Sequence, residues 1–438
     1  MPDYKDLGLD QNMRALSSLS NSAYLTERDF KQYIDDRVRN VRRPGGLDFQ
    51  AIKNTSLGYQ AIVGKDNTGG AFTDIQDAVN YVGGIGGGNI FLRQGTYVVD
   101  NSILVSTDGI RIFGESREGV TIFVANGANI GTVFRFVSND SSISNLTIDG
   151  NKNNVTSTNV LLSFGGMAAE VSGFTADGIL MKNQKGTLGC SAEIKTFGIR
   201  GVFKDCVAVD GEGVGFVASE FQDEGFFLNC KAGTCLAGFQ DDGGLAHFEQ
   251  CISESCIDGF VNIGATKISL CKSLSSTRYG YYLNGAVLTA SQSLSSGSYD
   301  AYLRNNVSVS NCDFFGTTPI LINGSNNSLV GNNITSVNGA ILIGTSTNNN
   351  VIGNIIRHSG TSNQADSAIF MLGTSARNII SGNVFNKTFS GAGSWAYGIR
   401  EDSANDDYNI VTSNQIGVSG TAIGTQGANT VVANNIVT

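Results

Sequence analysis

The stretch Ser141–Gly150, SSISNLTIDG, decides the fold, because shortened copies of it recur almost to the last residue of the chain. Later copies read VFKDCVAVDG, FEQCISES, VSNCDFFG, LVGNNITS and VTSNQIGV. Each copy carries one small or polar residue, and between Cys230 and Asn354 this residue recurs every 20 to 22 positions. These small-residue positions are Asn145, Gly173, Cys206, Cys230, Cys251, Cys271, Ser291, Cys312, Asn332, Asn354, Asn383, Asn414 and Asn434. A fixed period with variable insertions is typical of a solenoid.

A second landmark, Gly or Ala followed by an aromatic or aliphatic residue, comes about ten residues after the first. It occurs at Gly215, Gly238, Gly259, Gly280, Ala301, Ala340, Ala368, Gly398 and Ala422. Both landmarks open short runs in which β-branched or aromatic residues alternate with polar ones, as in a strand. Two or three short strands per repeat describe one coil of a parallel β-helix. We therefore predict an all-β solenoid and exclude a doubly wound α/β fold.

The amino-acid composition excludes several classes of function. The chain has 438 residues, 41% hydrophobic and 15% charged, with a formal net charge of −9. The negative charge argues against a nucleic-acid binder, which needs clustered Lys and Arg, and against adsorption to anionic lipid. The N-terminal residues lack an apolar core, and no run of 18 apolar residues occurs, so we expect neither a signal peptide nor membrane insertion.

Eight cysteines raise the question of disulfides or metal. Five of them share the small-residue positions with Ser291 and Asn332, where parallel side chains on stacked coils rarely reach disulfide torsion angles. We predict a reduced internal cysteine stack that continues into an asparagine ladder. Because the chain has only two histidines, we predict no metal site, and no cofactor either.

Residues 1–45 differ from the rest. Glu27–Val41 is a predicted helix with an apolar stripe, and Pro44 ends it. This segment is either a cap docked on the solenoid or an attachment and oligomerisation segment. Residues 46–145 hold a predicted capping box, Thr73–Gln76, and a helix whose apolar face closes the first coils. Residues 146–438 form the repetitive β-helix.

The stretch 71–99, AFTDIQDAVNYVGGIGGGNIFLRQGTYVV, followed by IRIFGES and SISNLTIDGN, resembles the opening of the pectate-lyase-like superfamily. This group includes pectate lyases, polygalacturonases, alginate epimerases and bacteriophage tailspikes. The resemblance covers about Leu47 to the C-terminus and implies a right-handed, single-stranded parallel β-helix with a capping helix. It does not select one activity, since these motifs are shared by all of them.

Carboxylates concentrate between Cys206 and Asp258, and the predicted catalytic acids are Asp241, Asp242 and Glu224. Aligned on the glycine landmarks, Asp241 precedes Asn262 on the next coil. Aligned on the small-residue positions, Glu220 and Asp241 become neighbours instead. The spacing of two such carboxyls would separate a retaining from an inverting glycosidase.

The Asp241-Asp242 pair, with His247 after it, is similar to the first part of the polygalacturonase pattern, whose second part is absent. A lyase usually needs a bound calcium ion, and no acidic trio at coil spacing would hold it. A hydrolase is therefore favoured over a lyase, and the alternative to both is a set of solvated loop acids.

Aromatic and basic residues supply candidate sugar-binding side chains: Tyr282, Arg304, Trp395 and Arg400. They belong to a wider set with further tyrosines in YGYYL and YDAYL, residues 279–283 and 299–303. Strand alternation predicts that about half of these tyrosines point into the core.

The resemblance, the missing signal peptide and the N-terminal helix together favour a bacteriophage tailspike or tail-fibre protein. Such a protein would be a homotrimer, made in the host cytoplasm and placed in the virion tail. It would bind host surface polysaccharide, with or without degrading it, and contact other tail proteins through residues 1–45. The alternatives are a free polysaccharide-degrading enzyme and a virion-structural β-helix without glycan binding.

Overall fold

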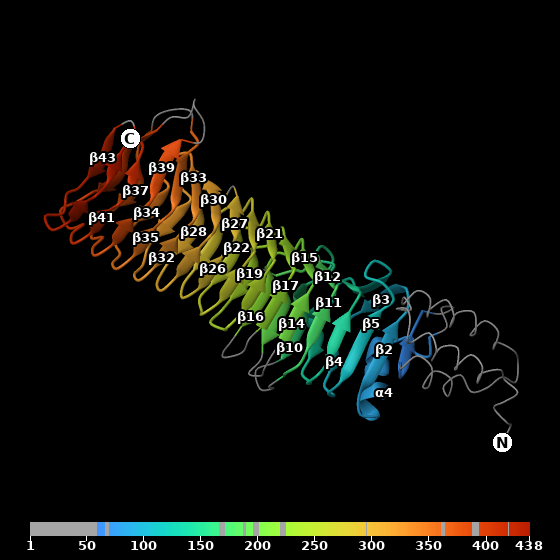
Figure 1. Ribbon diagram of the computed structural model, residues 1–438. Coiled ribbons are helices and arrows are strands. Elements are labelled where there is room, and N and C mark those ends of the chain that lie inside the picture. Colours follow the sequence, from blue (N-terminus) through green and yellow to red (C-terminus); the bar gives the residue numbers. More distant parts are fainter. Residues whose placement is uncertain are drawn as a thin grey trace, which may run out of the picture. The chain divides into compact units, whose positions relative to one another are not determined.

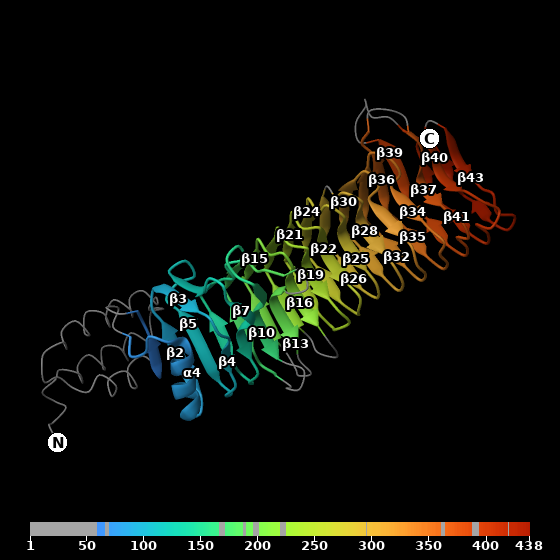
Figure 2. The same ribbon diagram turned by 180° about the vertical axis from the view of Figure 1, so that it is seen from behind.

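A computed structural model describes residues 59–65, 70–165, 171–186, 190–195, 201–219, 225–294, 296–360, 364–387, 394–418 and 420–438. The segment predicted for residues 1–45 lies outside these residues, as does Glu224. Gln60–Thr438 forms one compact unit. Figures 1 and 2 show its coils stacked in sequence order, from the blue N-terminal to the red C-terminal end.

Three parallel sheets run along the solenoid, and each coil contributes one strand to each. Sheet A contains, among the described residues, β1 (Ala61–Val63), β2 (Gly88–Leu92), β5 (Ile110–Gly114), β8 (Ser142–Ser144), β11 (Thr175–Asp177), β14 (Gly201–Lys204), β17 (Gly225–Leu228), β20 (His247–Glu249), β23 (Lys267–Ser269), β26 (Val287–Thr289), β29 (Ser308–Ser310), β32 (Ser328–Val330), β35 (Asn350–Ile352), β38 (Ile379–Ser381), β41 (Ile410–Thr412) and β44 (Val431–Ala433).

Sheet B follows sheet A in every coil after a short turn. It contains, in the same part of the chain, β3 (Gly95–Val99), β6 (Val120–Val124), β9 (Thr147–Asp149), β12 (Leu180–Lys182), β15 (Val207–Val209), β18 (Lys231–Gly233), β21 (Ile252–Glu254), β24 (Lys272–Leu274), β27 (Gln292–Leu294), β30 (Asp313–Gly316), β33 (Asn333–Ser336), β36 (Ile355–His358), β39 (Val384–Lys387), β42 (Gln415–Ile416) and β45 (Ile436–Val437).

Sheet C completes each coil. Its described strands are β4 (Ile103–Val105), β7 (Asn129–Phe136), β10 (Ser157–Gly165), β13 (Cys190–Lys195), β16 (Val214–Ser219), β19 (Ala237–Asp241), β22 (Asp258–Asn262), β25 (Tyr279–Leu283), β28 (Tyr299–Leu303), β31 (Ile320–Ile322), β34 (Ile341–Ile343), β37 (Gln364–Met371), β40 (Trp395–Glu401) and β43 (Thr421–Gly424). The predicted right-handed parallel β-helix is confirmed.

A single helix in the described part, α4 (Ile75–Gly84), covers the first coils and contacts β1, β2 and β4. Its buried face is the predicted one: Ile75, Ala78, Val79 and Val82. The predicted capping box is wrong in register, because Asp74 is the N-cap and its carboxylate accepts the amide of Asp77. The Gln76 side chain turns away and bonds the backbone of Leu104 in β4 instead.

The core is filled by aromatic rings that stack from coil to coil. In sheet A, Phe227 lies 5.4 Å from Phe203 and 5.0 Å from Phe248, measured between ring centroids. In sheet C, Phe260 lies 4.8 Å from Phe239 and 5.1 Å from Tyr281. These spacings follow the distance between parallel strands, so every coil offers the next a matching apolar face.

From β8 onward, a left-handed backbone residue follows each sheet A strand and turns the chain into sheet B. This residue has a φ of 54° at Asn145, 52° at Asn229 and 65° at Gly331. Asn and Gly tolerate this region best. Leu270 adopts it too, with a φ of 55°, because the stacked coils on either side impose the turn.

The residue after this turn points inward and forms a column along the solenoid, here named the ladder column. It consists of Leu146, Ile179, Cys206, Cys230, Cys251, Cys271, Ser291, Cys312, Asn332, Asn354, Asn383, Asn414 and Asn435. The cysteine stack that continues into an asparagine ladder is confirmed. Three of the predicted positions were wrong. Asn145 and Asn434 lie one residue before the ladder column, at the left-handed position, and Gly173 lies before β11 rather than after it.

A second asparagine ladder, which the sequence analysis missed, lies at the turn from sheet C to sheet A. Its members are Asn327, Asn349, Asn378 and Asn409, and the side-chain amide of each of the first three donates to the side-chain oxygen of the following one at 2.9 to 3.1 Å. It ends at the buried carboxylate of Glu401, which accepts the Asn409 amide at 2.9 Å. Both ladders fix the coil register, because a shifted coil would leave buried amides unsatisfied.

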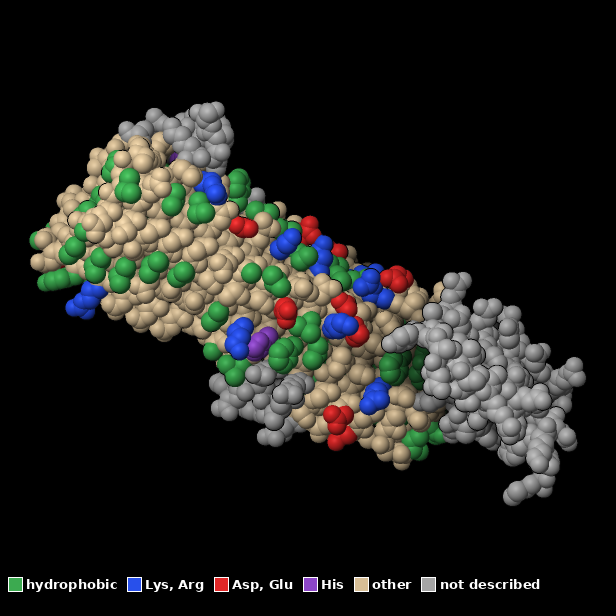
Figure 3. All heavy atoms as spheres, in the orientation of Figure 1, with side chains coloured by type: hydrophobic (Ala, Val, Ile, Leu, Met, Phe, Trp, Pro, Cys, Tyr) green, Lys and Arg blue, Asp and Glu red, His purple; other side chains and the backbone are tan. Residues whose placement is uncertain are grey.

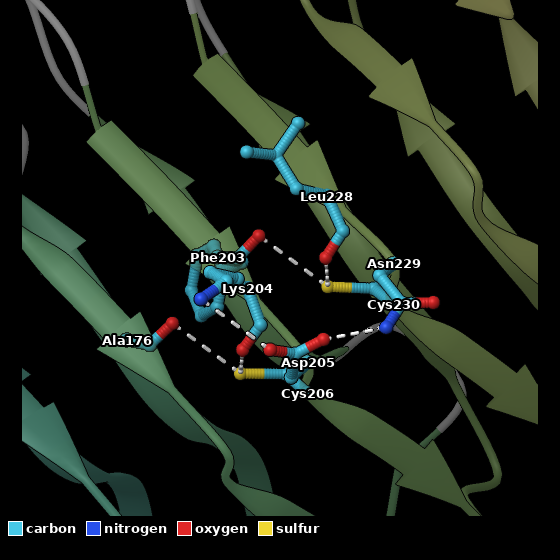
Figure 4. Close-up of polar contacts among 8 residues, drawn as sticks. All are labelled: Ala176, Phe203, Lys204, Asp205, Cys206, Leu228, Asn229 and Cys230. Atoms are coloured by element: carbon cyan, nitrogen blue, oxygen red, sulfur yellow. Dashed lines mark hydrogen bonds and ion pairs between the residues drawn. The ribbon is translucent and has the colours of Figure 1, made fainter.

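The first members of the cysteine stack appear in Figure 4, where each thiol donates to carbonyl oxygens of its own and the preceding coil. Cys206 Sγ lies 3.2 Å from the oxygen of Lys204 and 3.5 Å from that of Ala176. Burial raises the pKa of Cys206, and that of Cys312 to about 12. Reagents cannot reach thiols that are enclosed in the core, so this stack is structural.

The burial of the thiols predicts how fast they react with a reagent in solution. The seven cysteines with described side chains are buried and free, so in the folded protein a thiol-specific disulfide reagent should label them on the order of 100-fold more slowly than after unfolding, because exposure requires local opening. In guanidinium all eight should react. Absorbance of the released thiolate measures both rates. Rapid labelling of several thiols in the folded protein would contradict the burial of the stack.

Side-chain charge is unevenly distributed over the face drawn in Figure 3. Acidic and basic side chains are most frequent from the middle of the solenoid toward its N-terminal end, whereas the C-terminal coils show few of them and have single apolar side chains at intervals. This agrees with the sequence after about Asn305, which is rich in Asn, Ser, Gly and Thr.

Candidate functional site

Asp241 and Asp242, the two predicted catalytic acids that the structure describes, do not form a pair on the surface. Asp241 ends β19, and Asp242 follows it at an exposed position. The strand register places Ala218, Asp241 and Asn262 on successive coils, which confirms the alignment on the glycine landmarks. The alternative alignment on the small-residue positions is therefore wrong.

Asp241 is fully buried and serves the turn between β19 and β20. One carboxylate oxygen accepts the amide of Gly244 at 2.8 Å, and the other accepts Thr266 Oγ1 and Asn262 Nδ2. Burial raises the pKa of Asp241, and the hydrogen bond from Thr266 opposes this rise. A carboxylate enclosed in this way cannot reach a glycosidic bond, so the prediction of Asp241 as a catalytic acid is corrected.

The outer face of sheet C becomes aromatic at β25, on either side of two consecutive inward-facing residues that we call the bend. Gly280 and Tyr281 are consecutive and both buried, and a Cβ on Gly280 would lie 2.2 Å from the hydroxyl of Ser293 in the interior. Because two successive positions face inward, the residues on either side both face outward. Tyr279 and Tyr282 therefore share the outer face, with ring centroids 5.7 Å apart.

The next coil repeats this arrangement, which produces a cluster of four half-buried rings. Tyr282 and Tyr302 stack at 5.1 Å with an interplanar angle of 5°. Tyr279 lies 5.3 Å from Tyr302 and 6.4 Å from Tyr299. We name these four residues the tyrosine surface. Simple alternation predicts that about half of the tyrosines point inward, but only Tyr281 of this group is buried, because the bend breaks the alternation.

An ion pair fixes the cationic edge of the tyrosine surface. Arg278 Nε donates to Asp258 Oδ1 at 2.8 Å, and its Nη2 donates to Oδ2. Asp258 is buried, while the arginine side chain is 55% exposed and lies 5.1 Å from the ring centroid of Tyr279. The hydrogen bond that Arg278 donates to Asp258 raises the pKa of Arg278, so the guanidinium stays charged and oriented.

The opposite edge is polar as well. Arg304 Nη1 donates to the hydroxyl of Tyr282 at 3.1 Å, and Asn323 Nδ2 donates to the hydroxyl of Tyr302 at 2.8 Å. No carboxylate among the described residues forms an ion pair with Arg304. The structure thus brings together Tyr282 and Arg304, two of the four residues predicted to bind sugar. Asp258 and Asn323 were missed, because only the coil register shows that they border the tyrosines.

Trp395, the third predicted sugar-binding residue, is fully buried at the start of β40. Its ring packs edge-on against His358 at 5.1 Å, and its indole nitrogen donates to the carbonyl of Asn338. A ring enclosed on its faces cannot stack on a sugar, so this prediction is corrected.

Arg400, the fourth, lies on the outer face of sheet C. Its guanidinium carbon is 5.0 Å from the ring centroid of Phe370 and 5.1 Å from that of Tyr397. The side chain is 38% exposed, and its Nη2 forms an ion pair with Oδ1 of Asp402 at 3.5 Å. Arg400 therefore combines an aromatic support with a partly exposed guanidinium, whose further N–H donors can bond a ligand.

A hollow of about 360 Å³ lies elsewhere, near the C-terminal end of sheet B. Its lining in the described part is Val384, Phe385, Asn386, Gln415, Gly417, Val418 and Thr438. None of these residues is an acid or a base, so the hollow offers no catalytic group for proton transfer at neutral pH.

Comparison with known proteins supports the fold. No family model and no curated protein matches the chain. Among solved structures, the chain resembles a double mutant of the tailspike protein of E. coli bacteriophage HK620 in complex with a pentasaccharide, with a TM-score of 0.62 and 11% identity over 89% of this chain and 83% of that one. It also resembles a PL6-family polysaccharide lyase from Pseudopedobacter saltans, with a TM-score of 0.51 and 9% identity over 86% and 92%.

These likenesses confirm the parallel β-helix fold and, at this level of identity, nothing finer. Searched over its described residues, the chain has no helix of the length and apolar character that would cross a bilayer.

Proposed function

We propose that this chain is a tailspike-type protein that binds a cell-surface polysaccharide along the outer face of sheet C. The observation that supports this most is the tyrosine surface, in which four rings pack against one another on two adjacent coils. The structural likeness to a tailspike that holds a pentasaccharide supports the same reading.

The chemistry of the tyrosine surface fits a sugar ring. An aromatic ring offers an apolar face to the C–H side of a pyranose, while its hydroxyl and a neighbouring guanidinium bond the sugar hydroxyls. Tyr282 and Tyr302 stack on each other, and Arg304 and Asn323 hold their hydroxyls in place. The rings are therefore preorganised, which lowers the entropic cost of binding.

Binding is proposed in preference to hydrolysis, because the predicted acid pair is not available: Asp241 belongs to the core. Asp242 is exposed and accepts a hydrogen bond from Gln240 at 2.6 Å. Asp242 and Glu224 remain predictions. If the protein is an adhesin, Asp242→Ala should leave polysaccharide binding unchanged, and a degrading activity that this variant lost would instead support hydrolysis.

Replacing a tyrosine of this surface should weaken binding. We expect Tyr282→Ala and Tyr302→Ala each to raise the Kd by roughly tenfold, about 1.4 kcal/mol, because each removes a half-buried ring from the contact. The measurement is biolayer interferometry on immobilised smooth lipopolysaccharides and capsular polysaccharides from a panel of bacteria.

Tyr81→Ala is the matched control, since Tyr81 is an exposed tyrosine on α4. It should bind like the parent protein. If the parent binds a polysaccharide and both tyrosine variants bind it equally well, the site is elsewhere. If the parent binds no member of the panel, the virion-structural alternative gains.

The phage role includes assembly as a homotrimer and attachment to other tail proteins through residues 1–45. Light scattering should then give three times the 46.1 kDa of one chain, and a chain that begins at Leu47 should give a smaller or less stable assembly. A monomer at full length would contradict the trimeric spike and favour a free carbohydrate-binding protein.

A further inference from the structure

We propose that the outer face of sheet C carries a second sugar-binding centre, formed by Phe370, Tyr397 and Arg400. We infer that one polysaccharide chain runs along the solenoid axis across this centre and the tyrosine surface. The inference rests on the proposed function and adds the direction and the minimum length of the bound chain.

The second centre is built by the same bend as the first. Gly398 and Ile399 are consecutive and both buried, and a Cβ on Gly398 would lie 2.5 Å from the side chain of Ile416 in the interior. The flanking residues, Tyr397 and Arg400, therefore both face outward, as Tyr279 and Tyr282 do on β25. Their contact of 5.1 Å repeats the geometry of the tyrosine surface with an arginine in place of one ring.

Strand register places the two centres on one line. The outward position of Tyr282 pairs through successive coils with Tyr302, Leu321, Leu342, Phe370 and finally Arg400. Five steps of roughly 4.8 Å put Tyr282 and Arg400 roughly 24 Å apart along the axis. Figure 2 shows the strands that carry this line, β25, β28, β34, β37 and β40, succeeding one another along the solenoid.

The path between the centres is apolar and uncharged. Leu321 and Leu342 are half-buried and hold the two register positions between Tyr302 and Phe370. A sugar chain that follows this line meets rings or aliphatic side chains at every coil. It ends on a guanidinium whose donors suit sugar hydroxyls or an acidic substituent. A chain that crossed the coils at right angles would contact only one centre.

Two centres on one line imply that affinity depends on ligand length. A fragment that spans both centres gains the second contact as an intramolecular step, whereas a shorter fragment occupies one centre at a time. Arg400 should thus matter for long fragments and not for short ones bound at the tyrosine surface. A structural role for Arg400 would not depend on fragment length.

The test uses the full chain and partial acid hydrolysates of the same bacterial lipopolysaccharides and capsular polysaccharides, separated by length. Binding of each fraction is measured for the parent protein and for Arg400→Ala. Arg117→Ala is the matched control, since Arg117 is 40% exposed and pairs only with its neighbour Glu118. Thermal unfolding of each variant verifies that the fold is retained.

We expect Arg400→Ala to weaken the longest fractions by about tenfold, the value of roughly one lost hydrogen bond to a charged group, and the shortest by less than twofold. Arg117→Ala should change neither. An equal effect at all lengths, or an affinity that stops rising once fragments cover the tyrosine surface, would overturn the two-centre inference while leaving the proposed function intact. No binding of any fraction to the parent protein would overturn both.

Discussion

Replacing Asn383 with leucine is expected to lower the free energy of unfolding by about 3–5 kcal/mol, because several buried polar groups lose their partners at once. Asn383 Oδ1 accepts the backbone and side-chain amides of Asn354 at 2.9 Å, and its Nδ2 donates to Val351 O at 2.8 Å and Asn414 Oδ1 at 3.0 Å. Leucine has a similar shape but can make none of these bonds. Denaturant unfolding followed by circular dichroism measures the loss.

The control for this variant is Asn405→Leu, at an exposed position where the side chain faces solvent. We expect it to change the free energy of unfolding by less than about 0.5 kcal/mol. If Asn383→Leu were as mild as the control, the ladder would not stabilise the stack, and the apolar core alone would set the coil register. Since a stacked solenoid can unfold in parts, the midpoint and the slope of the transition should both be compared.

The fold could be predicted because each coil repeats the same physical solution. A small residue at the inward turn position and a glycine or alanine at the start of the sheet C strand recur at a nearly fixed spacing. Strand type follows from alternation and from the absence of helical periodicity between the landmarks. The second ladder was missed because its asparagines, such as Asn327 and Asn349, stand among many others in an Asn-rich sequence. Only the register shows which of them point inward.

The candidate site was less predictable, since it depends on which way individual side chains point. Tyr282, Arg304 and Arg400 could be named from their chemistry, and they do lie on one face. Asp241 and Trp395 have equally suitable chemistry, but both are buried. The sequence could not separate inward from outward residues reliably, because sheet C places two consecutive residues inside, as at Gly280 and Tyr281. A strict period of two cannot reveal such a bend.

The burial of Asp300 could not be predicted, because the sequence alignment of its coil was wrong by one residue. The sequence pattern equates Ala301 with Gly280, whereas the structure pairs Ala301 with Tyr281. Asp300 therefore occupies the inward position that glycine holds on the preceding coils, and it is 1% exposed. One carboxylate oxygen accepts Ser293 Oγ at 2.9 Å, and the other has no hydrogen-bond partner among the described residues.

This burial makes the stability of the fold depend on pH. Burial raises the pKa of Asp300 from 3.8 to about 6. The folded protein thus binds this proton more tightly than the unfolded chain does. The contribution to stability is fully present below about pH 4, falls as the pH rises, and is lost above about pH 6. A pKa difference of about two units corresponds to roughly 3 kcal/mol.

Asp300→Asn should remove this loss, because asparagine keeps the shape and the acceptor for Ser293 and Ser296 but does not ionise. Between pH 4 and pH 7, the variant should lose about 3 kcal/mol less unfolding free energy than the parent protein does. Urea unfolding at the two pH values measures this difference. The matched control is Asp242→Asn, an exposed aspartate, which should follow the parent at both pH values. An Asp300→Asn variant with the parent's pH dependence would mean that another group controls acid stability. A variant less stable than the parent at pH 7 would mean that the ionised carboxylate stabilises this coil.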